Sequence, residues 1–284
     1  MSRPKNAMNR PIFLTTLTVL LGLTLAACTA TGEAPVDEAP VDEAAVEGDG
    51  DQVLVMATAA DYPPYEFYEA AAGGGEPVGF DIDIAKYITD QLGYELEIQD
   101  MAFNNIIPAL QGERVDFAMA GMTPTEARKQ SIDFTDVYYD AKSTIVAPAD
   151  AGYEGYDDLA GATVGVQLGS IQEKELKLQA ETIDGITVEP RNKISELVQE
   201  IKAGRIDAAV IENTVSKGYV QNNDDLEFTT VELDGESGSA IAFPQNSELR
   251  TEFDQALDEM KGNGAMDELI NRWFEAYYEQ QGAE

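Results

Sequence analysis

From residue 53 onward, segments with the apolar pattern of a strand alternate with segments in which apolar residues have helical spacing. "VLVMAT" (53–58) is a continuous apolar run, typical of a strand buried on both faces. From Asp83 to Leu92 the apolar residues have helical spacing, and Gly93 fits the residue that ends such a helix. "YELEI" (94–98) then alternates between polar and apolar residues, as a strand does. This stretch therefore predicts a β-α-β unit.

The same alternation continues toward the C-terminus. Further predicted strands are "RVDFAMAG" (114–121), "STIVAP" (143–148), "ATVGVQ" (162–167), "GITVEP" (185–190), "RIDAAVIE" (205–212) and "SAIAFP" (239–244). Predicted helices are "NNIIPALQG" (104–112), "YDDLAG" (156–161), "SIQEKELKLQAE" (170–181), "KISELVQEIKAG" (193–204), "NTVSKGYVQNN" (213–223) and two within 247–280, broken at "GNG". Such a series predicts open α/β sheets.

One segment of the chain echoes another. Residues 109–121 and 200–212 both read as a helix ending near a glycine, then Arg, a β-branched residue and Asp, then an apolar strand. Either α/β units simply look alike, or the chain has two similar lobes, each with its own sheet. Ligands in open α/β sheets lie beyond the carboxyl ends of strands. Here those ends are Gly121 and Glu212.

The segment after Gly121 has the features of an anion site. Thr123 fits an N-cap, Pro124 the first helical position and Glu126 the third, and this combination predicts a capping box. A helix start offers free amides and a positive dipole end, and Arg128 one turn later can hold a carboxylate through two parallel bonds. The alternative is a capped helix whose Arg128 pairs with a nearby acid, Glu126 or Asp133.

A second helix start follows Gly169, near Ser170, and also presents amides. Glu212, at the end of its predicted strand, would suit an ammonium group. A carboxylate cradle and an ammonium acceptor a short distance apart fit an α-amino acid.

The charge composition excludes several functions. The 284 residues include 53 acidic and 18 basic residues and no histidine. Nucleic-acid binding is excluded because a phosphate backbone requires a basic surface. The lack of histidine argues against histidine catalysis and histidine metal ligands, and we expect no metal or cofactor.

The N-terminal residues predict export. A basic start precedes the 17-residue apolar run "PIFLTTLTVLLGLTLAA", which ends at Cys28. "LAAC" resembles a lipoprotein processing site, so we expect residues 1–27 to be a signal peptide and Cys28 to be lipidated; the alternative is a chance or buried thiol. Residues 28–52 are acidic and lack aromatic residues, which predicts a disordered tether rather than an acidic docking site.

Four motifs carry a family resemblance. "GFDIDIAKYI", "IIPALQGERVDFAMAGMTPTEARKQSIDFTDVYY", "GATVGVQLGS" and "GRIDAAVIE" occur in order. The chain resembles the family 3 extracellular solute-binding proteins, the amino-acid receptors of ABC importers, over about residues 53–280. The resemblance implies an α/β, two-lobed periplasmic-binding-protein-like fold (type II), with lobes joined by two hinge strands. Residues 53–145 and 235–280 would form lobe one, and residues 146–234 lobe two.

The resemblance also implies a ligand site. Arg128 would grip the α-carboxylate with the amides of Thr123 and Ile171, while Glu212 would bind the α-ammonium with the carbonyl of Gly121. Two positions depart from the family: Ile171 stands where many members have Ser or Thr, and Glu212 where many have Asp. The full set of expected ligand-binding residues is Asp61, Tyr62, Phe103, Gly121, Met122, Thr123, Arg128, Gly169, Ser170, Ile171 and Glu212.

The expected function is that of a receptor and not an enzyme. It would bind an amino acid, polar neutral or basic, and deliver it to an ABC permease as a lipid-anchored, extracytoplasmic monomer. Whether Asp61, Glu66 or Lys142 reaches the ligand side chain is open. Tyr62 and Phe103 would sandwich that side chain unless they are ordinary core aromatics. The alternatives are a small-carboxylic-acid dehydratase with Glu212 as general acid, and a sensor ectodomain or a transglycosylase module.

Overall fold

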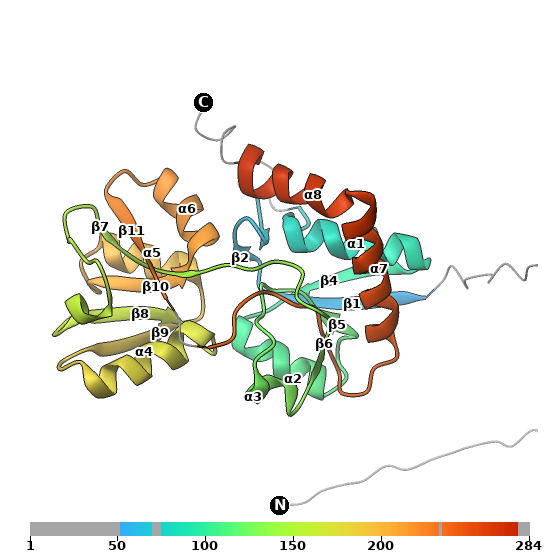
Figure 1. Ribbon diagram of the computed structural model, residues 1–284, viewed down its shortest axis with the longest axis horizontal. Coiled ribbons are helices and arrows are strands. Elements are labelled where there is room, and N and C mark those ends of the chain that lie inside the picture. Colours follow the sequence, from blue (N-terminus) through green and yellow to red (C-terminus); the bar gives the residue numbers. More distant parts are fainter. Residues whose placement is uncertain (1–51, 70–74, 233–234, 278–284) are drawn as a thin grey trace, which may run out of the picture. The chain divides into compact units, whose positions relative to one another are not determined.

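The fold is built on two five-stranded sheets. The computed structural model describes residues 52–69, 75–232 and 235–277; Cys28, the signal peptide and the tether lie outside them. Figure 1 shows that each sheet is flanked by its own helices and that two chain segments cross between them. This α/β, two-lobed arrangement is the expected fold class, and the second of the two interpretations of the internal echo is confirmed.

The first sheet has the strand order β4-β1-β5-β12-β6. Strand β1 pairs in parallel with β4 and β5, while β12 is antiparallel to β5 and β6. The strands are β1 (Val53–Thr58), β4 (Glu95–Asp100), β5 (Phe117–Ala118), β6 (Asp133–Phe134) and β12 (Ala242–Phe243). A separate two-stranded hairpin follows β1, formed by β2 (Asp61–Tyr62) and β3 (Glu66–Phe67).

The second sheet has the order β11-β7-β10-β8-β9. β8 is parallel to β10 and β9, whereas β7 is antiparallel to β10 and β11. The strands are β7 (Ser143–Pro148), β8 (Thr163–Gln167), β9 (Thr187–Arg191), β10 (Ala208–Glu212) and β11 (Leu226–Val231). The expected lobe boundary between residues 145 and 146 falls inside β7. Because all of β7 bonds within this sheet, the chain crosses before Ser143.

The helices largely follow the sequence pattern. In α1 (Phe80–Leu92) Ile84, Ala85 and Ile88 are buried and Leu92 is half-buried, and Gly93 ends the helix in the left-handed conformation at φ 78°. The others are α2 (Ile106–Gln111), α3 (Glu126–Lys129), α4 (Ile171–Thr182), α5 (Ile194–Lys202), α6 (Asn213–Gln221), α7 (Leu249–Asn263) and α8 (Ala265–Ile270). Short turns of 3-10 helix occur at Phe103–Asn105 and Tyr156–Leu159, and a π-helical turn at Asn271–Ala276 follows α8. None of the described helices combines the length and apolar character needed to cross a bilayer.

The predicted capping box at Thr123 is wrong. Helix α3 is only four residues long, and its N-cap is Thr125, whose hydroxyl accepts from the amide of Arg128 at 3.3 Å. Thr123 lies outside the helix, and its carbonyl accepts from the amide of Thr125. Glu126 is therefore the first helical residue and not the third, since the chain turns once more after Pro124 before it becomes helical.

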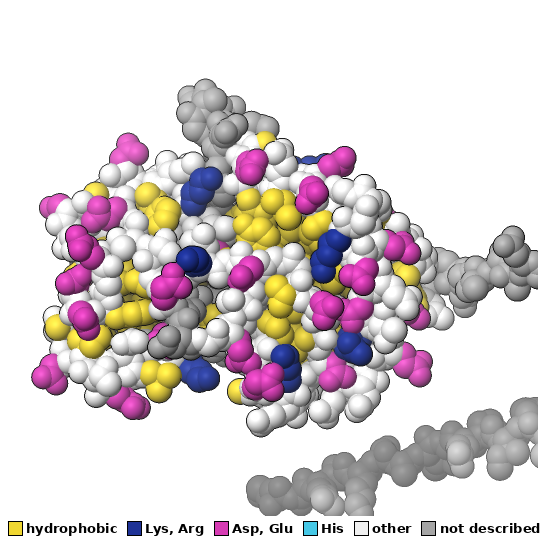
Figure 2. Space-filling view, in the orientation of Figure 1, with side chains coloured by type: hydrophobic (Ala, Val, Ile, Leu, Met, Phe, Trp, Pro, Cys, Tyr) yellow, Lys and Arg dark blue, Asp and Glu magenta, His cyan; other side chains and the backbone are white. Residues whose placement is uncertain are grey.

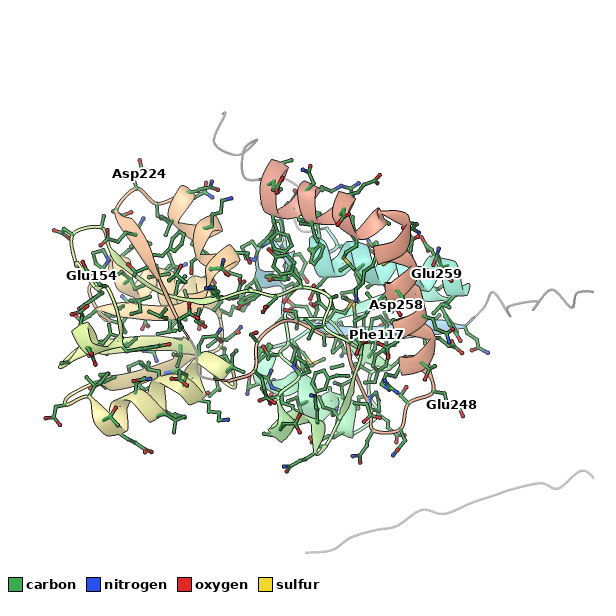
Figure 3. All side chains as sticks on the ribbon, viewed as in Figure 1. Phe117, Glu154, Asp224, Glu248, Asp258 and Glu259 are labelled. Carbon is green, nitrogen blue, oxygen red and sulfur yellow. The ribbon has the colours of Figure 1, made fainter. Side chains whose placement is uncertain are left out.

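Two crossing segments connect the sheets. They pair with each other through Tyr139 and Ser239, which form an isolated antiparallel bridge. The amide of Tyr138 donates to the carbonyl of Ser239 at 2.9 Å, and the amide of Ser239 donates to the carbonyl of Tyr139 at 2.7 Å. One hydrophobic cluster contains residues of both lobes near these crossings, including Tyr65, Tyr138 and Ile194. Phe117, labelled in Figure 3, lies in the same cluster, whereas the labelled acidic side chains are exposed.

Candidate ligand-binding site

A cavity of about 490 Å³, including the part open to solvent, is lined by residues of both lobes and of the crossing segments. The lining residues are Tyr62, Phe103, Ala120, Gly121, Thr123, Arg128, Ala141, Lys142, Ser143, Gln167, Ser170, Ile171, Gln172, Glu212, Gly238 and Ser239.

Arg128 places a positive charge in the lining of the cavity. Its side chain is buried, and its guanidinium donates to the carbonyl of Thr123 at 2.7 Å and to that of Gly169 at 3.0 Å. It also lies over the ring of Phe103, 5.4 Å from the ring centre. Burial lowers the pKa of Arg128 to about 10, which leaves it charged near neutrality.

The alternative in which Arg128 pairs with Glu126 or Asp133 is wrong. Glu126 pairs with Lys129 at 3.0 Å, and Asp133 accepts from the amide of Asn246 at 2.7 Å. Among the described residues no carboxylate lies within ion-pair distance of the Arg128 guanidinium. Within the described part of the chain, only the more distant charge of Glu236 acts on this buried guanidinium, which favours an anionic ligand because burying a charge without a direct partner is costly.

Glu212 is the anion of the cavity. It is buried at the end of β10, and its carboxylate accepts from the amide of Thr214 at 2.9 Å and from the hydroxyl of Thr214 at 2.6 Å. Burial raises the pKa of Glu212 to about 7, although the bonds from Thr214 act in the opposite direction. The cavity therefore holds a cation and an anion on opposite lobes, which is the arrangement that a zwitterion requires.

The helix start of α4 completes the polar wall. The helix begins near Ser170, as predicted; Ser170 is its N-cap, and its hydroxyl accepts from the amide of Glu173 at 3.0 Å. The first-turn amides at Ile171 and Gln172 have no acceptor within the helix, as in any helix start. Their amides and the dipole favour negative charge at this point of the cavity.

Eight of the eleven expected residues line the cavity: Tyr62, Phe103, Gly121, Thr123, Arg128, Ser170, Ile171 and Glu212. Three do not. Met122 is 1% exposed and belongs to the core, while the carbonyl of Gly169 accepts from Arg128 and its amide donates to Glu173.

Asp61 is the third expected residue outside the cavity lining. Its carboxylate accepts from the amide of Ile194, the first residue of α5, at 2.7 Å, and its carbonyl accepts from the hydroxyl of Tyr219 at 3.2 Å. Asp61 thus joins the first lobe to the second. Burial raises its pKa to about 6.

The two other residues left open also have other roles. Glu66 is fully buried and is not among the lining residues. Lys142 lines the cavity but its ammonium pairs with Glu232 at 2.9 Å on the exposed side of the crossing.

Several lining residues were not predicted. Gln167 ends β8, and its buried side-chain nitrogen has no hydrogen-bond partner in the described residues. The rule that ligands lie beyond strand ends, applied to "ATVGVQ", would have identified it. Ser143 follows the first crossing, and Gly238 and Ser239 lie on the second, so only the spatial pairing of the crossings brings them together.

Comparisons with known proteins agree with this architecture. Residues 54–276 match the model of the bacterial extracellular solute-binding proteins, family 3. The chain is 48% identical over 227 residues to the arginine-binding extracellular protein ArtP of Bacillus subtilis (strain 168), which covers 79% of this chain and 87% of that protein.

Two solved structures show the same fold. An ancestral arginine-binding protein bound to arginine is 40% identical with a TM-score of 0.73, covering 78% of this chain and 98% of that one. The ancestral arginine-binding protein bound to glutamine is also 40% identical, with a TM-score of 0.72 and coverage of 78% and 97%. With a family match across most of its length and two sheets that share one charged cavity, this chain belongs to the bacterial extracellular solute-binding proteins, family 3.

Proposed function

We propose that this chain is an extracytoplasmic receptor that binds L-arginine between its two lobes and delivers it to an ABC permease. The observation that carries the proposal is the pair of opposite charges in one cavity, Arg128 on the first lobe and Glu212 on the second. Two of the similar proteins reported above have arginine binding in their names.

Each end of the amino acid has a proposed partner. Arg128 holds the α-carboxylate, helped by the amides of Thr123 and Ile171, and Glu212 holds the α-ammonium with the carbonyl of Gly121. Charge-assisted hydrogen bonds of this kind contribute about 1.5–3 kcal/mol each.

The aromatic wall and the charge of the protein support a cationic side chain. Tyr62 and Phe103 both line the cavity, and a guanidinium lying on either ring gains cation–π energy. Figure 2 shows Asp and Glu side chains spread over the displayed face, with fewer Lys and Arg. With a formal charge of −35 for the whole chain, the long-range field attracts cations.

L-Glutamine is the second candidate, and one observation favours it. The buried side-chain nitrogen of Gln167 lacks an acceptor, and the carbonyl of a ligand amide would supply one. A guanidinium has no acceptor to offer.

The transport step follows from lobe closure. A ligand that touches Arg128 and Glu212 together binds the closed form more tightly than the open form, so it shifts the population toward closure. The closed form then docks on the permease. No chemical step on the ligand is involved, so the protein acts as a receptor and not as an enzyme.

We further propose that the mature protein is a monomer anchored by a lipid on Cys28. The support is the apolar run that precedes Cys28 and the sequence "LAAC", which ends at Cys28. Cys28→Ser would release the protein from the membrane fraction while leaving ligand binding unchanged. Membrane retention of Cys28→Ser would contradict the anchor, and sedimentation of the released protein as a dimer would contradict the monomer.

Calorimetric titration of the purified protein with each of the twenty amino acids tests the ligand. We expect saturable one-to-one binding that is tightest for L-arginine, with the ligand recovered unchanged. Tightest binding of L-glutamine would favour the second candidate. Absence of binding by all twenty, or conversion of the ligand, would contradict the receptor function.

A further inference from the structure

A buried pair of carboxyl groups lies behind the ligand cavity. Glu66 of β3 is 0% exposed, and within the described residues neither of its carboxyl oxygens has a hydrogen-bond donor. Asp81, in the first turn of α1, is also 0% exposed, and its amide donates to the carbonyl of Tyr65, the residue directly before Glu66. Two adjacent buried carboxylates would repel each other strongly, so the pair requires an explanation.

Gly79 brings the two carboxyl groups together. It has φ 138°, and a Cβ at this position would lie 2.1 Å from the carbonyl oxygen of Tyr65. This close approach lets the amides of Phe80 and Asp81 donate to the carbonyls of Pro64 and Tyr65, each at 2.9 Å. The start of α1 is thereby fixed against the β2–β3 hairpin.

The hydrogen bonds of Asp81 identify it as the ionised member. It accepts from the amide of Gly121 at 2.9 Å and from the hydroxyl of Tyr138 at 2.8 Å. Glu66 accepts from neither, and an un-ionised Glu66 can donate its proton to Asp81. One proton between the two groups then satisfies both.

The surrounding charges favour the same assignment. Burial, with the repulsion of Asp81, Asp61 and Asp100, raises the pKa of Glu66 well above its usual range. Burial raises the pKa of Asp81 to about 6, against the lowering effect of the bonds from Gly121, Tyr138 and Glu66. Burial raises the pKa of Tyr62 and of Tyr138 well above the usual range, so both neighbouring phenols keep their protons.

We propose that Glu66 donates a shared proton to Asp81, and that Asp81 is a positioning residue that fixes Gly121 at the ammonium end of the cavity. Gly121 lies in the left-handed region at φ 54°, and its Cα faces the ring of Tyr62, which an added Cβ would approach to 3.1 Å. The hydrogen bond from the Gly121 amide to Asp81 fixes the position of Gly121, and the carbonyl of Gly121 is the group that accepts from the ligand ammonium. The inference rests on the proposed role of Gly121 in amino-acid binding.

The second bond of Asp81 reaches a crossing segment. Tyr138, which donates to Asp81, also donates its amide to Ser239 on the second crossing. Asp81 therefore joins the ammonium end of the cavity to the segments that connect the lobes, without touching the ligand itself.

An infrared comparison tests the shared proton without any ligand. The protein and its Glu66→Gln variant are compared at about pH 7.5, and the difference spectrum is expected to contain the carbonyl stretching band of a buried protonated carboxyl group. Its absence would rule out the shared proton. The result holds even if the parent protein binds no amino acid, an outcome that would overturn the proposed function instead.

Binding of L-arginine by Asp81→Asn tests the positioning role. The asparagine cannot accept from both Gly121 and Tyr138 with the strength of a carboxylate, so we expect at least tenfold weaker binding and a shifted amide proton resonance for Gly121. Asp83→Asn is the control: Asp83 belongs to the same turn but bonds Arg272 and Trp273, away from the cavity, and should change affinity less than twofold.

A purely structural role gives a different pattern. If Asp81→Asn lowers the unfolding temperature but binds L-arginine within twofold of the parent, the positioning role is wrong. If Asp81→Asn does not fold, the Gly121 amide resonance in Glu66→Gln becomes the measure, because the proposal requires it to stay within the hydrogen-bonded range.

Discussion

The guanidinium of Arg128 joins the two lobes, since it donates to the carbonyl of Gly169 over 3.0 Å. Arg128 belongs to α3 in the first lobe, and Gly169 precedes α4 in the second. The residue that we propose for the ligand carboxylate thus also contacts the opposite lobe. Ligand binding and lobe closure therefore depend on the same side chain.

Replacing Arg128 should abolish most of the affinity. Arg128→Ala removes two or more charge-assisted bonds and leaves the ligand carboxylate buried without a partner, at a cost of about 3 kcal/mol or more, or at least about 100-fold in Kd. Calorimetric titration with L-arginine measures the change. The matched control is Lys129→Ala, because within the described part of the chain Lys129 pairs with exposed Glu126 alone and its loss should have an effect below about 0.5 kcal/mol. An Arg128→Ala affinity within threefold of the parent would reject the assignment.

Affinity should fall as the pH is lowered through neutrality. The pKa of Glu212 in the ligand-free protein is raised to about 7 by burial, whereas a bound ammonium requires the carboxylate. Below about pH 7 the ligand must therefore displace a proton, and Kd should weaken by up to about tenfold per pH unit. Titrations at several pH values, each in two buffers with different ionisation enthalpies, count the protons released.

Glu212→Gln is the control for this pH dependence. It should bind more weakly than the parent at about pH 8, and its affinity should vary little with pH between about 6.5 and 7.5, above the pKa values of about 6 of Asp61 and Asp81. If the variant keeps the slope of the parent, another group is titrating.

Asp61→Asn should weaken the binding of all ligands by the same factor. Asp61 bonds α5 of the second lobe and lies outside the cavity lining, so its loss disfavours closure without changing contacts to the ligand. We expect about a tenfold loss of affinity, corresponding to the ~1.5 kcal/mol of one charge-assisted bond. The order of preference among arginine, lysine and glutamine should stay the same, which a calorimetric panel measures.

Asp100→Asn is the matched variant for Asp61→Asn. Asp100 also accepts from a backbone amide, that of Ala60 at 3.0 Å, but within the first lobe. Its replacement should lower stability and leave affinity unchanged. A changed order of preference in Asp61→Asn would place this carboxylate against the ligand after all.

The case of Asp61 illustrates how far the sequence predicts the structure. Long periodic segments such as α1 and α5, and apolar runs such as β1 and β10, were predicted because their own residues determine them. The partner of Asp61 lies 133 residues away, and no local pattern specifies that approach.

Short elements were missed for a related reason. Strands β2, β3 and β6 have two residues each, which is too few for a period to appear. Strand β11 was also missed, although "LEFTTV" is rich in β-branched and aromatic residues. In the site, most residues at strand ends and helix starts were predicted, Gln167 at the end of β8 excepted, whereas Ser143, Gly238 and Ser239 depend on the pairing of two crossings far apart in sequence.

Stability of the ligand-free protein should decrease as the pH rises from about 5 to about 8. Burial raises the pKa of Asp61 and Asp81 to about 6 and that of Glu212 to about 7, against unfolded values near 4. Between these limits the folded state binds more protons than the unfolded state. The contribution of these three groups to the free energy of unfolding is therefore greatest below about pH 4 and is lost as the pH rises through 6–7. Thermal unfolding followed by circular dichroism at about pH 5 and pH 8 measures the difference.

The formal charge of −35 acts in the same direction, but about 1 M salt reduces the Debye length to about 3 Å and screens it. The decrease should therefore persist in high salt and become smaller in Glu212→Gln; an unfolding temperature that rises with pH under these conditions would show that the buried carboxyl groups are ionised without cost.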